Sequence, residues 1–450
     1  MPERKRICIL TYASSWSALA AARCLGAAGI EIIAGDHNIL ATGCFSKYSK
    51  HCFLYKNPEL YQREYLEKLI EVAKKYGGPD VDLVIMPMHT DCFVLAAHQE
   101  LFDGVAKLAL PTFDQIKLAG NKALLAGFCR QHNINIPKTS QPKSLEEFNA
   151  DIDKFKFPVF IKLQESNASI GLKKVSTPEE ARDFFISSIK EHNSAPDEYP
   201  IIQEAVAGED FCSTFIFSHG VKKASMTYHN ILDFPPKSGM GVLRENVSAE
   251  EMEKIGEKVL ELMNWHGVAE VDFRWDGKNA PYLIEINPRF WGGLGQSIAA
   301  GWDYPNMLFQ LALDGDIPVI KPRPKDIKTF NPCLIFLLLA EEFMEAKHPI
   351  KEIEAAFHTL KLNFKKHHFH SLEKFIKQLA KAVNPADRFK AAKSVIEQAH
   401  GSINEMFNWK DPLPVLGLLY PLAVFLKNGK ISPKILVSES KIQKLDFDNK

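Results

Sequence analysis

The chain has 450 residues, with 55 Lys and Arg against 55 Asp and Glu, so its formal net charge is zero. A nucleic-acid-binding domain is usually basic, so this balance argues against that class. Apolar residues make up 46% and charged residues 24%, which is ordinary for a soluble protein of two to four lobes. The eight cysteines form no Cys-x-x-Cys pair, so we expect neither a zinc knot nor a disulfide framework, and we expect a cytoplasmic protein.

Short apolar runs alternate with amphipathic segments in the first 112 residues. Strands are predicted over 7–10, 30–34 and 81–86, and helices over 18–26 and 61–76. This alternation is typical of a doubly wound α/β unit with a parallel sheet. The serines that follow the first strand argue against a secretory signal. His89, Thr90 and Asp91 follow the strand over 81–86, where such sheets bind ligands, although a solvated loop is the alternative.

The most informative stretch is 268–293, which predicts a β-hairpin. Alternate residues of a strand point to the same face, so Glu270, Asp272 and Arg274 share one face of the first strand. The turn is predicted at Asp276-Gly277, a dipeptide typical of hairpins. The hairpin therefore carries a polar face opposite its apolar one.

The returning strand places Glu285 and Asn287 on one face, roughly 7 Å apart at two residues of strand rise. Together with Asp272, these side chains can point into one small volume. Two carboxylates and one amide suit a hard cation such as Mg²⁺, or Mn²⁺ in its place. The alternative is the ordinary polar face of a half-buried strand.

The order Glu285-Ile-Asn-Pro-Arg289, followed by aromatic-aromatic-Gly-Gly over 290–293, goes beyond simple alternation. This string resembles the metal-binding signature of the ATP-grasp superfamily, most closely its carboxylate–amine ligase and carbamoyl-phosphate-synthase-like branch. The resemblance covers roughly residues 1–315. It implies an α/β and α+β fold with a pre-ATP-grasp domain over 1–112, a two-lobed ATP-grasp domain over 113–318 that divides near 195, and a mostly helical region over 319–450.

The resemblance also implies two lysines that bind ATP. Lys122 lies on a helix predicted over 118–131, where a solvated lysine is the alternative. Lys162 lies inside the apolar strand 157–163, where a lysine is costly unless it is paired or faces a ligand.

Further nucleotide contacts follow from the same resemblance. The loop 164–172 is expected to cover the phosphates, with Ser169 and Gly171 as contacts. The segment 200–210 resembles the adenine hinge. Its expected contacts are Glu204, Ala205 and Val206 for adenine and Asp210 for the ribose hydroxyls.

Two arginines are candidate catalytic residues. The segment 233–247 is rich in Pro and Gly and predicts a loop, in which relatives carry an arginine that contacts substrate or phosphate. That arginine is Arg244 here, and an ordinary surface arginine is the alternative. Arg289 of the motif is expected to hold an oxyanion.

The implied reaction is ATP-dependent ligation of a small-molecule carboxylate to an amine through an acyl phosphate, with release of ADP and phosphate. A non-catalytic ATP-binding scaffold with this fold is an alternative. A third hypothesis is a membrane-surface ligase, because the region 320–450 combines apolar segments with clustered basic residues. A helical cap packed on the core is the other explanation of that region. The clustered residues are Lys361, Lys365, Lys366, Lys374, Lys377, Lys381, Arg388, Lys390 and Lys393.

Overall fold

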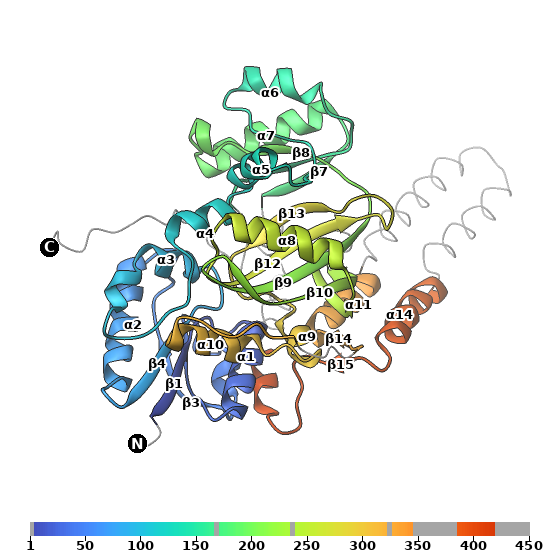
Figure 1. Ribbon diagram of the computed structural model, residues 1–450. Coiled ribbons are helices and arrows are strands. Elements are labelled where there is room, and N and C mark those ends of the chain that lie inside the picture. Colours follow the sequence, from blue (N-terminus) through green and yellow to red (C-terminus); the bar gives the residue numbers. More distant parts are fainter. Residues whose placement is uncertain (1–3, 166–170, 235–238, 322–325, 345–384, 419–450) are drawn as a thin grey trace, which may run out of the picture.

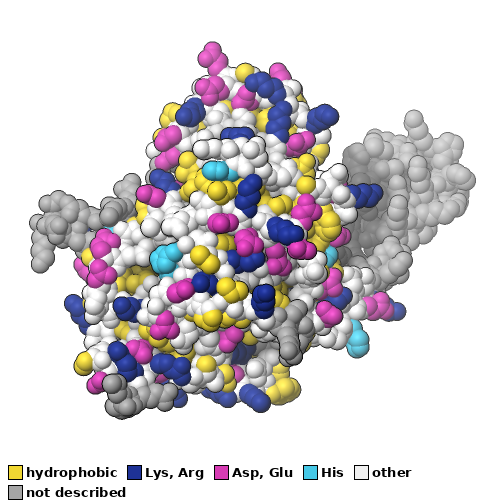
Figure 2. Space-filling view, viewed as in Figure 1, with side chains coloured by type: hydrophobic (Ala, Val, Ile, Leu, Met, Phe, Trp, Pro, Cys, Tyr) yellow, Lys and Arg dark blue, Asp and Glu magenta, His cyan; other side chains and the backbone are white. Residues whose placement is uncertain are grey.

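The computed structural model describes residues 4–165, 171–234, 239–321, 326–344 and 385–418. Three β-sheets lie one after another along the molecule, with helices between and around them (Figure 1). The predicted mixed α/β class is confirmed. Figure 2 shows acidic and basic side chains interspersed over the face of the molecule seen in Figure 1.

The N-terminal sheet is parallel throughout and has the order β3-β2-β1-β4. Its strands are β1 (Lys5–Leu10), β2 (Glu31–Asp36), β3 (Ser49–Leu54) and β4 (Val81–Met86). Its helical segments are α1 (Trp16–Ala27), η1 (Thr42–Phe45), α2 (Gln62–Tyr76), α3 (Asp91–Ala97) and η2 (Gln99–Phe102). Alternate residues of β1 enter two different cores, one shared with α1 and one shared with α2 and α3. Helices therefore cover both faces, and the predicted doubly wound unit is confirmed.

A small lobe follows, with the antiparallel order β5-β8-β6-β7. Its elements are α4 (Phe113–Gly120), α5 (Lys122–Gln131), β5 (Thr139–Ser140), α6 (Leu145–Ile152), β6 (Val159–Lys162), β7 (Leu172–Val175), α7 (Pro178–His192), η3 (Pro196–Glu198) and β8 (Ile201–Glu204). The single helix predicted over 118–131 is wrong, because two helices meet at Asn121. The Asn121 side chain accepts hydrogen bonds from the backbone N–H groups of Ala123 and Leu124 and so caps a new helix.

The central sheet has the order β13-β12-β9-β10-β11-β14-β15. Its strands are β9 (Glu209–Ser218), β10 (Val221–Phe234), β11 (Met240–Val247), β12 (Gly267–Trp275), β13 (Tyr282–Asn287), β14 (Lys328–Phe330) and β15 (Ile403–Asn404). Helix α8 (Glu250–Leu262) packs on one face through Met252, Val259 and Leu260. Helices α9 (Leu294–Ala299) and α10 (Tyr304–Asp314) join the opposite face to the N-terminal domain (Figure 1).

The loop predicted over 233–247 is wrong, because these residues form the arms of a β-hairpin. Asp233 pairs with Gly241 and Leu232 pairs with Leu243, and Leu243 is fully buried. The apolar residues Val242 and Leu243, which follow the Pro- and Gly-rich sequence, are buried in the sheet. Part of the tip, 235–238, lies outside the described residues.

The C-terminal region contributes β14 and β15 to the central sheet, and the helices α11 (Pro332–Met344), α14 (Pro385–Ala399) and η5 (Leu413–Leu418). Two anchors hold its last described part on the core. The first is the ion pair of 2.8 Å between Arg23 Nε and Asp411 Oδ2, and the second is Glu405 beside Arg244. The basic residues between 361 and 381 lie outside the described residues. Within the described part of the chain, we find no helix whose length and apolarity would let it span a bilayer.

Candidate active site

The candidate site lies where the small lobe faces the central sheet. Lys122 is the first residue of α5, directly after the capping Asn121. Its backbone N–H donates to the carbonyl oxygen of Gln164 at 3.0 Å, which ties the start of the helix to the end of the β6 segment. The Lys122 Nζ lies 3.5 Å from Glu285 Oε2 on β13, so a small-lobe cation meets a central-sheet carboxylate.

Lys162 is a buried cation on β6. Its Nζ donates to Gln203 Oε1 at 2.7 Å, and only 6% of the residue is exposed. Burial lowers the pKa of Lys162 to about 8, although Glu285 acts in the opposite direction. The Lys162 ammonium is buried and donates to a neutral amide, so its charge is poorly compensated and an anion such as a phosphate would stabilise it.

The structure brings the three predicted metal ligands together on the β12–β13 pair. Asp272 is the cross-strand partner of Glu285, and Glu270 is the partner of Asn287. Asn287 Nδ2 donates to Asp272 Oδ2 at 3.0 Å and to Glu270 Oε2 at 3.2 Å. Asn287 Oδ1 accepts a hydrogen bond of 3.2 Å from Arg289 Nη2. The predicted strand pairing and the meeting of these side chains are therefore confirmed, although six residues join the strands where a tight Asp276-Gly277 turn was predicted. The role of these residues as ligands remains a prediction.

The charges of this group fit a cation. Burial raises the pKa of Asp272 well above its ordinary value, and the neighbouring Glu270 and Glu285 add to the rise. Asp272 Oδ1 is buried and has no hydrogen-bond partner. Burial alone would also raise the pKa of Glu285, but Lys122, Lys162 and Arg289 outweigh it and lower that pKa. An open carboxylate oxygen among oxygen ligands is the arrangement that Mg²⁺ accepts.

Sequence reasoning did not include Glu270, Cys212 and Tyr228 in the site. Glu270 is 6% exposed and accepts a hydrogen bond from the Tyr228 hydroxyl group. Cys212 on β9 is the cross-strand partner of Asp272. The strand period already placed Glu270 on the same face as Asp272, and its burial was the missing information.

The proposed adenine hinge connects β8 to β9. Glu204, Ala205 and Val206 are half-buried, and the Glu204 backbone N–H donates to Lys138 O at 2.9 Å. Gly208 has φ +126°, and a side chain there would collide with the backbone of Trp275. The hinge therefore needs glycine at this position.

The two other predicted nucleotide contacts have partners within the protein. The Asp210 carboxylate forms an ion pair with Arg274 on the adjacent strand β12. Gly171 has φ +62°, and its carbonyl oxygen accepts from the Leu163 backbone N–H at 2.9 Å. Ser169 lies outside the described residues. The contacts of these residues with nucleotide remain predictions.

Arg244 is buried under the C-terminal segment. Its guanidinium lies 2.8 Å from Glu405 Oε1 and also donates to the carbonyl oxygen of Gly241. Thr329 Oγ1 donates to the same Glu405 oxygen at 2.6 Å. The glycine pair at the end of the motif makes room here, because a Cβ on Gly293 would lie 2.7 Å from the Tyr228 hydroxyl oxygen. The structure thus places Arg244 beside Tyr228, with a protein carboxylate as its partner.

The N-terminal domain brings an aromatic group to the Arg289 side of the site. Tyr12, with φ +45°, stacks on His89 with ring centroids 4.9 Å apart. Burial lowers the pKa of His89 to about 3, and the charges of Arg289 and His37 add to the effect. His89 is therefore a neutral ring near Arg289 at neutral pH.

Thr90 and Asp91 have structural partners. Thr90 Oγ1 donates to Glu59 Oε1 at 2.8 Å, and the Tyr65 hydroxyl donates to Asp91 Oδ2 at 2.6 Å. Both Thr90 and Asp91 are buried. His89 also lies 3.1 Å from Thr90 through its Nδ1, and of the three residues it is the one whose pKa is lowered by the charge of Arg289.

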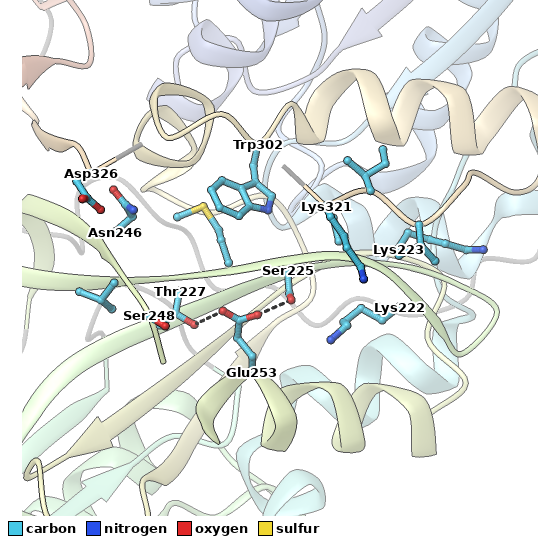
Figure 3. A pocket seen from close by; sticks show the side chains of 15 residues that line it. Lys222, Lys223, Ser225, Thr227, Asn246, Ser248, Glu253, Trp302, Lys321 and Asp326 are labelled. Carbon is cyan, nitrogen blue, oxygen red and sulfur yellow. Dashed lines mark hydrogen bonds between the residues drawn. The ribbon is translucent and has the colours of Figure 1, made fainter. Parts of the chain in front are cut away.

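A separate cavity of about 410 Å³ lies beside the first half of β10 (Figure 3). The carboxylate of Glu253 faces it and accepts hydrogen bonds from Ser225 at 2.6 Å and Thr227 at 3.5 Å. None of the predicted site residues lines this cavity. It is distinct from the group of side chains around Lys122, Lys162 and Glu285.

Comparison with known proteins gives consistent results. A family model described as ATP-grasp in the biosynthetic pathway with Ter operon matches residues 236–331. D-alanine–D-alanine ligase B of Clostridium perfringens is 24% identical over 236 residues, which is 48% of this chain and 76% of that ligase.

Solved structures resemble the fold over a larger share of the chain. The biotin carboxylase domain of 2-oxoglutarate carboxylase from Hydrogenobacter thermophilus, in complex with MgADP, has a TM-score of 0.56 at 15% identity and covers 73% of each chain. The L-amino acid ligase of Bacillus licheniformis has a TM-score of 0.54 at 12% identity, covering 71% of this chain and 78% of that one. Both likenesses concern the fold.

Proposed function

We propose that this chain, which belongs to the ATP-grasp superfamily, is a Mg²⁺-dependent ligase that joins a small-molecule carboxylate to an amine through an acyl phosphate. The observation that carries the proposal is the meeting of Lys122 and Glu285 at 3.5 Å across the gap between the lobes. The charge of Lys162 also acts on Glu285, while Asp272 is the cross-strand partner of Glu285 and accepts a hydrogen bond from Asn287. Two lysines thus lie opposite three oxygen-bearing side chains. A nucleoside triphosphate with its divalent ion needs both: cations for the phosphates and oxygen ligands for the ion.

Each step of the reaction balances with the groups in the site. An oxygen of the substrate carboxylate forms a bond to the γ-phosphorus of ATP, and the bond from that phosphorus to the β-γ bridging oxygen breaks. ADP leaves, and Lys122 and Lys162 neutralise charge on the phosphoryl oxygens. The amine nitrogen then attacks the acyl carbon, phosphate leaves, and the nitrogen loses a proton to solvent. Arg289 stabilises the negative oxygen that develops on that carbon.

Asp272, Glu285 and Asn287 would hold Mg²⁺, or Mn²⁺ in its place. When bound, the ion would neutralise phosphate charge between the two lobes. Asp272 supports this role because its Oδ1 is buried and lacks a hydrogen-bond partner. Glu285 supports it because its carboxylate is ionised at neutral pH, given that its pKa is lowered.

Amino acids are the first substrates to test. Two of the similar proteins are named as ligases of D-alanine and of L-amino acids. An amino acid has both groups that the reaction joins, so it can serve as the carboxylate, as the amine or as both. Neutral aromatic rings such as Tyr12 and His89 beside Arg289 would allow an ammonium group to approach.

The test is ADP release from Mg·ATP in the presence of a panel of amino acids and other amines. Glu285→Gln should lower turnover about 10²–10³-fold, as the loss of one preorganised electrostatic group does. Glu250→Gln, at an exposed position on α8, is the matched control and should keep wild-type turnover. Wild-type turnover in Glu285→Gln would refute the site.

The alternatives give different results in the same experiment. A non-catalytic ATP-binding scaffold would bind Mg·ATP tightly and release no ADP with any member of the panel. A membrane-surface ligase would sediment with anionic liposomes. Deleting residues 320–450 is not a clean test of this, because the deletion removes β14 and β15 from the central sheet and would also disturb folding. Neutralising the basic residues between 361 and 381 is the better variant for that test.

A further inference from the structure

Three potential metal ligands lie together at the base of the site, on two neighbouring strands. They are Cys212 Sγ on β9 and one oxygen each of Glu270 and Asp272 on β12, and all lie within 4.8 Å of one another. Ligand atoms about 2.0–2.3 Å from one ion are separated by at most about twice that distance. Small side-chain movements would therefore bring all three onto a single ion.

The charge of this cluster is not balanced by an ion pair. Among the residues that the structure describes, no Lys or Arg nitrogen lies within 4.0 Å of a carboxylate oxygen of Glu270 or Asp272. The neutral groups Tyr228 Oη and Asn287 Nδ2 donate to them instead. Arg289 and Arg244 act on the charge of Glu270 from a greater distance and do not outweigh the effect of burial, which raises its pKa. Adjacent buried carboxylates are costly without a cation or a proton. The buried Oδ1 of Asp272, which lacks a partner, shows where one acceptor remains open.

The chemistry of the cluster differs from that of the proposed Mg²⁺ site. Asp272, Glu285 and Asn287 offer oxygen alone, which suits a hard ion. Cys212 adds sulfur, and it is 7% exposed, so water does not compete for it. A thiolate favours softer ions such as Zn²⁺ or Cd²⁺ over Mg²⁺.

We propose that Cys212, Glu270 and Asp272 form an inner cation position that takes a thiophilic divalent ion such as Zn²⁺ or Cd²⁺, and that this position shares Asp272 with the Mg²⁺ site. Binding replaces the thiol S–H bond with a sulfur–metal bond, and the proton passes to solvent. Because Asp272 cannot serve both ions fully, a thiophilic ion at the inner position weakens Mg²⁺ binding at the outer one. The inner position does not depend on the ligase reaction.

The test is a titration of the nucleotide-free full chain with Cd²⁺, followed by the ultraviolet absorption of the sulfur–cadmium bond. Cys52 is exposed and lies close to Cys44, with its Sγ 3.7 Å from the Cys44 carbonyl oxygen. The titration is therefore made in a Cys52→Ser background, to remove that surface thiol. One equivalent of Cd²⁺ should produce the absorption band.

Paired variants identify the ligands. Cys212→Ser should abolish the band, and Cys92→Ser, at another buried cysteine in the N-terminal domain, should leave it unchanged. Glu270→Gln should weaken Cd²⁺ binding at least tenfold, and Glu285→Gln should keep the band because Glu285 serves only the outer site. An undiminished band in Cys212→Ser would overturn the proposal.

A second measurement covers the case in which Cys212→Ser fails to fold. Crystals of the unsubstituted protein soaked in Zn²⁺ should show an anomalous peak between Cys212, Glu270 and Asp272, and no peak there would also overturn the inference. ADP release is measured separately. A Cd²⁺ band without ADP release would uphold the inner position and refute the ligase proposal, whereas ADP release without a Cd²⁺ band would do the reverse.

Discussion

Removing the charge of Glu405 should destabilise the protein strongly. Glu405 and Arg244 form an ion pair of 2.8 Å with side chains 4% and 3% exposed. Glu405→Gln keeps the size of the side chain but leaves the Arg244 guanidinium buried without a counter-charge. Breaking a buried pair from one side costs about 3–5 kcal/mol. Thr329, which donates to the same oxygen at 2.6 Å, cannot compensate, because a hydroxyl group has no negative charge.

The assay is urea denaturation, with the free energy of unfolding and its dependence on urea concentration fitted for each variant. Glu250→Gln breaks the fully exposed pair with Lys254 and should give no change beyond experimental error. The double variant Arg244→Met/Glu405→Leu should recover most of the loss, because a buried pair replaced by apolar groups is often neutral. If Glu405→Gln were as stable as the unsubstituted protein, the pair would not be buried as the structure has it.

Four further predictions concern the proposed nucleotide site, the C-terminal segment and the hinge, and the first two of them are about Lys162. The pKa of Lys162 is about 8 in the free protein, so the affinity for Mg·ATP should fall as pH rises through that value. In Lys162→Arg the affinity should not change over the same pH range. Calorimetric titration at several pH values measures both. Because this pKa is depressed, Lys162 should also make the protein more stable, not less, as pH rises from 8 toward the unfolded value of 10.5. Asp411→Asn removes the carboxylate held by Arg23 and Ser46 and should expose residues 385–418 to early proteolysis, whereas Asp276→Asn at an exposed turn should not. Gly208→Ala should lower the free energy of unfolding by at least about 1–3 kcal/mol because of backbone strain. Gly127→Ala, at an open position on α5, is the control and should raise it by about 0.5–1 kcal/mol. Equal free energies of unfolding for the two variants would contradict the geometry of the hinge.

The parts of the site that the sequence could predict are those made by local structure. The strand period placed Asp272 and Glu285 on the polar faces of their strands, and the structure pairs them across β12 and β13. The exact register could not be predicted, because β12 and β13 are joined by six residues instead of a two-residue Asp-Gly turn, and a bulge follows Asp272. Lys162 stood out because a lysine in an apolar strand needs a partner. In both cases the signal lies within about twenty residues of the side chain concerned.

Contacts between distant segments could not be predicted in this way. Glu405 meets Arg244 161 residues away, and Asp411 meets Arg23 388 residues away. Neither acid has a hydrophobic period or a motif that sets it apart from other acids in a C-terminal region. The break at Asn121 shows a different limit, because an Asn continues a helical pattern unless its side chain turns back to cap the next helix.

The carboxylates of the candidate site are of two kinds, one partly exposed and paired with a lysine and one buried among neutral donors. Glu285 has a side chain 35% exposed, so its 3.5 Å contact with Lys122 is screened by water and exchanges partners at little cost. Glu270 is buried and its hydrogen-bond donors are neutral, although the more distant charges of Arg289 and Arg244 partly offset the effect of burial on its pKa. The phosphates of a bound nucleotide would therefore attract Lys122 away from Glu285. The Glu285 carboxylate would then have lost a counter-charge, which would favour a divalent ion beside Asp272. Under the proposed function we therefore expect nucleotide and metal binding to be coupled, because Lys122 and Glu285 would take part in both.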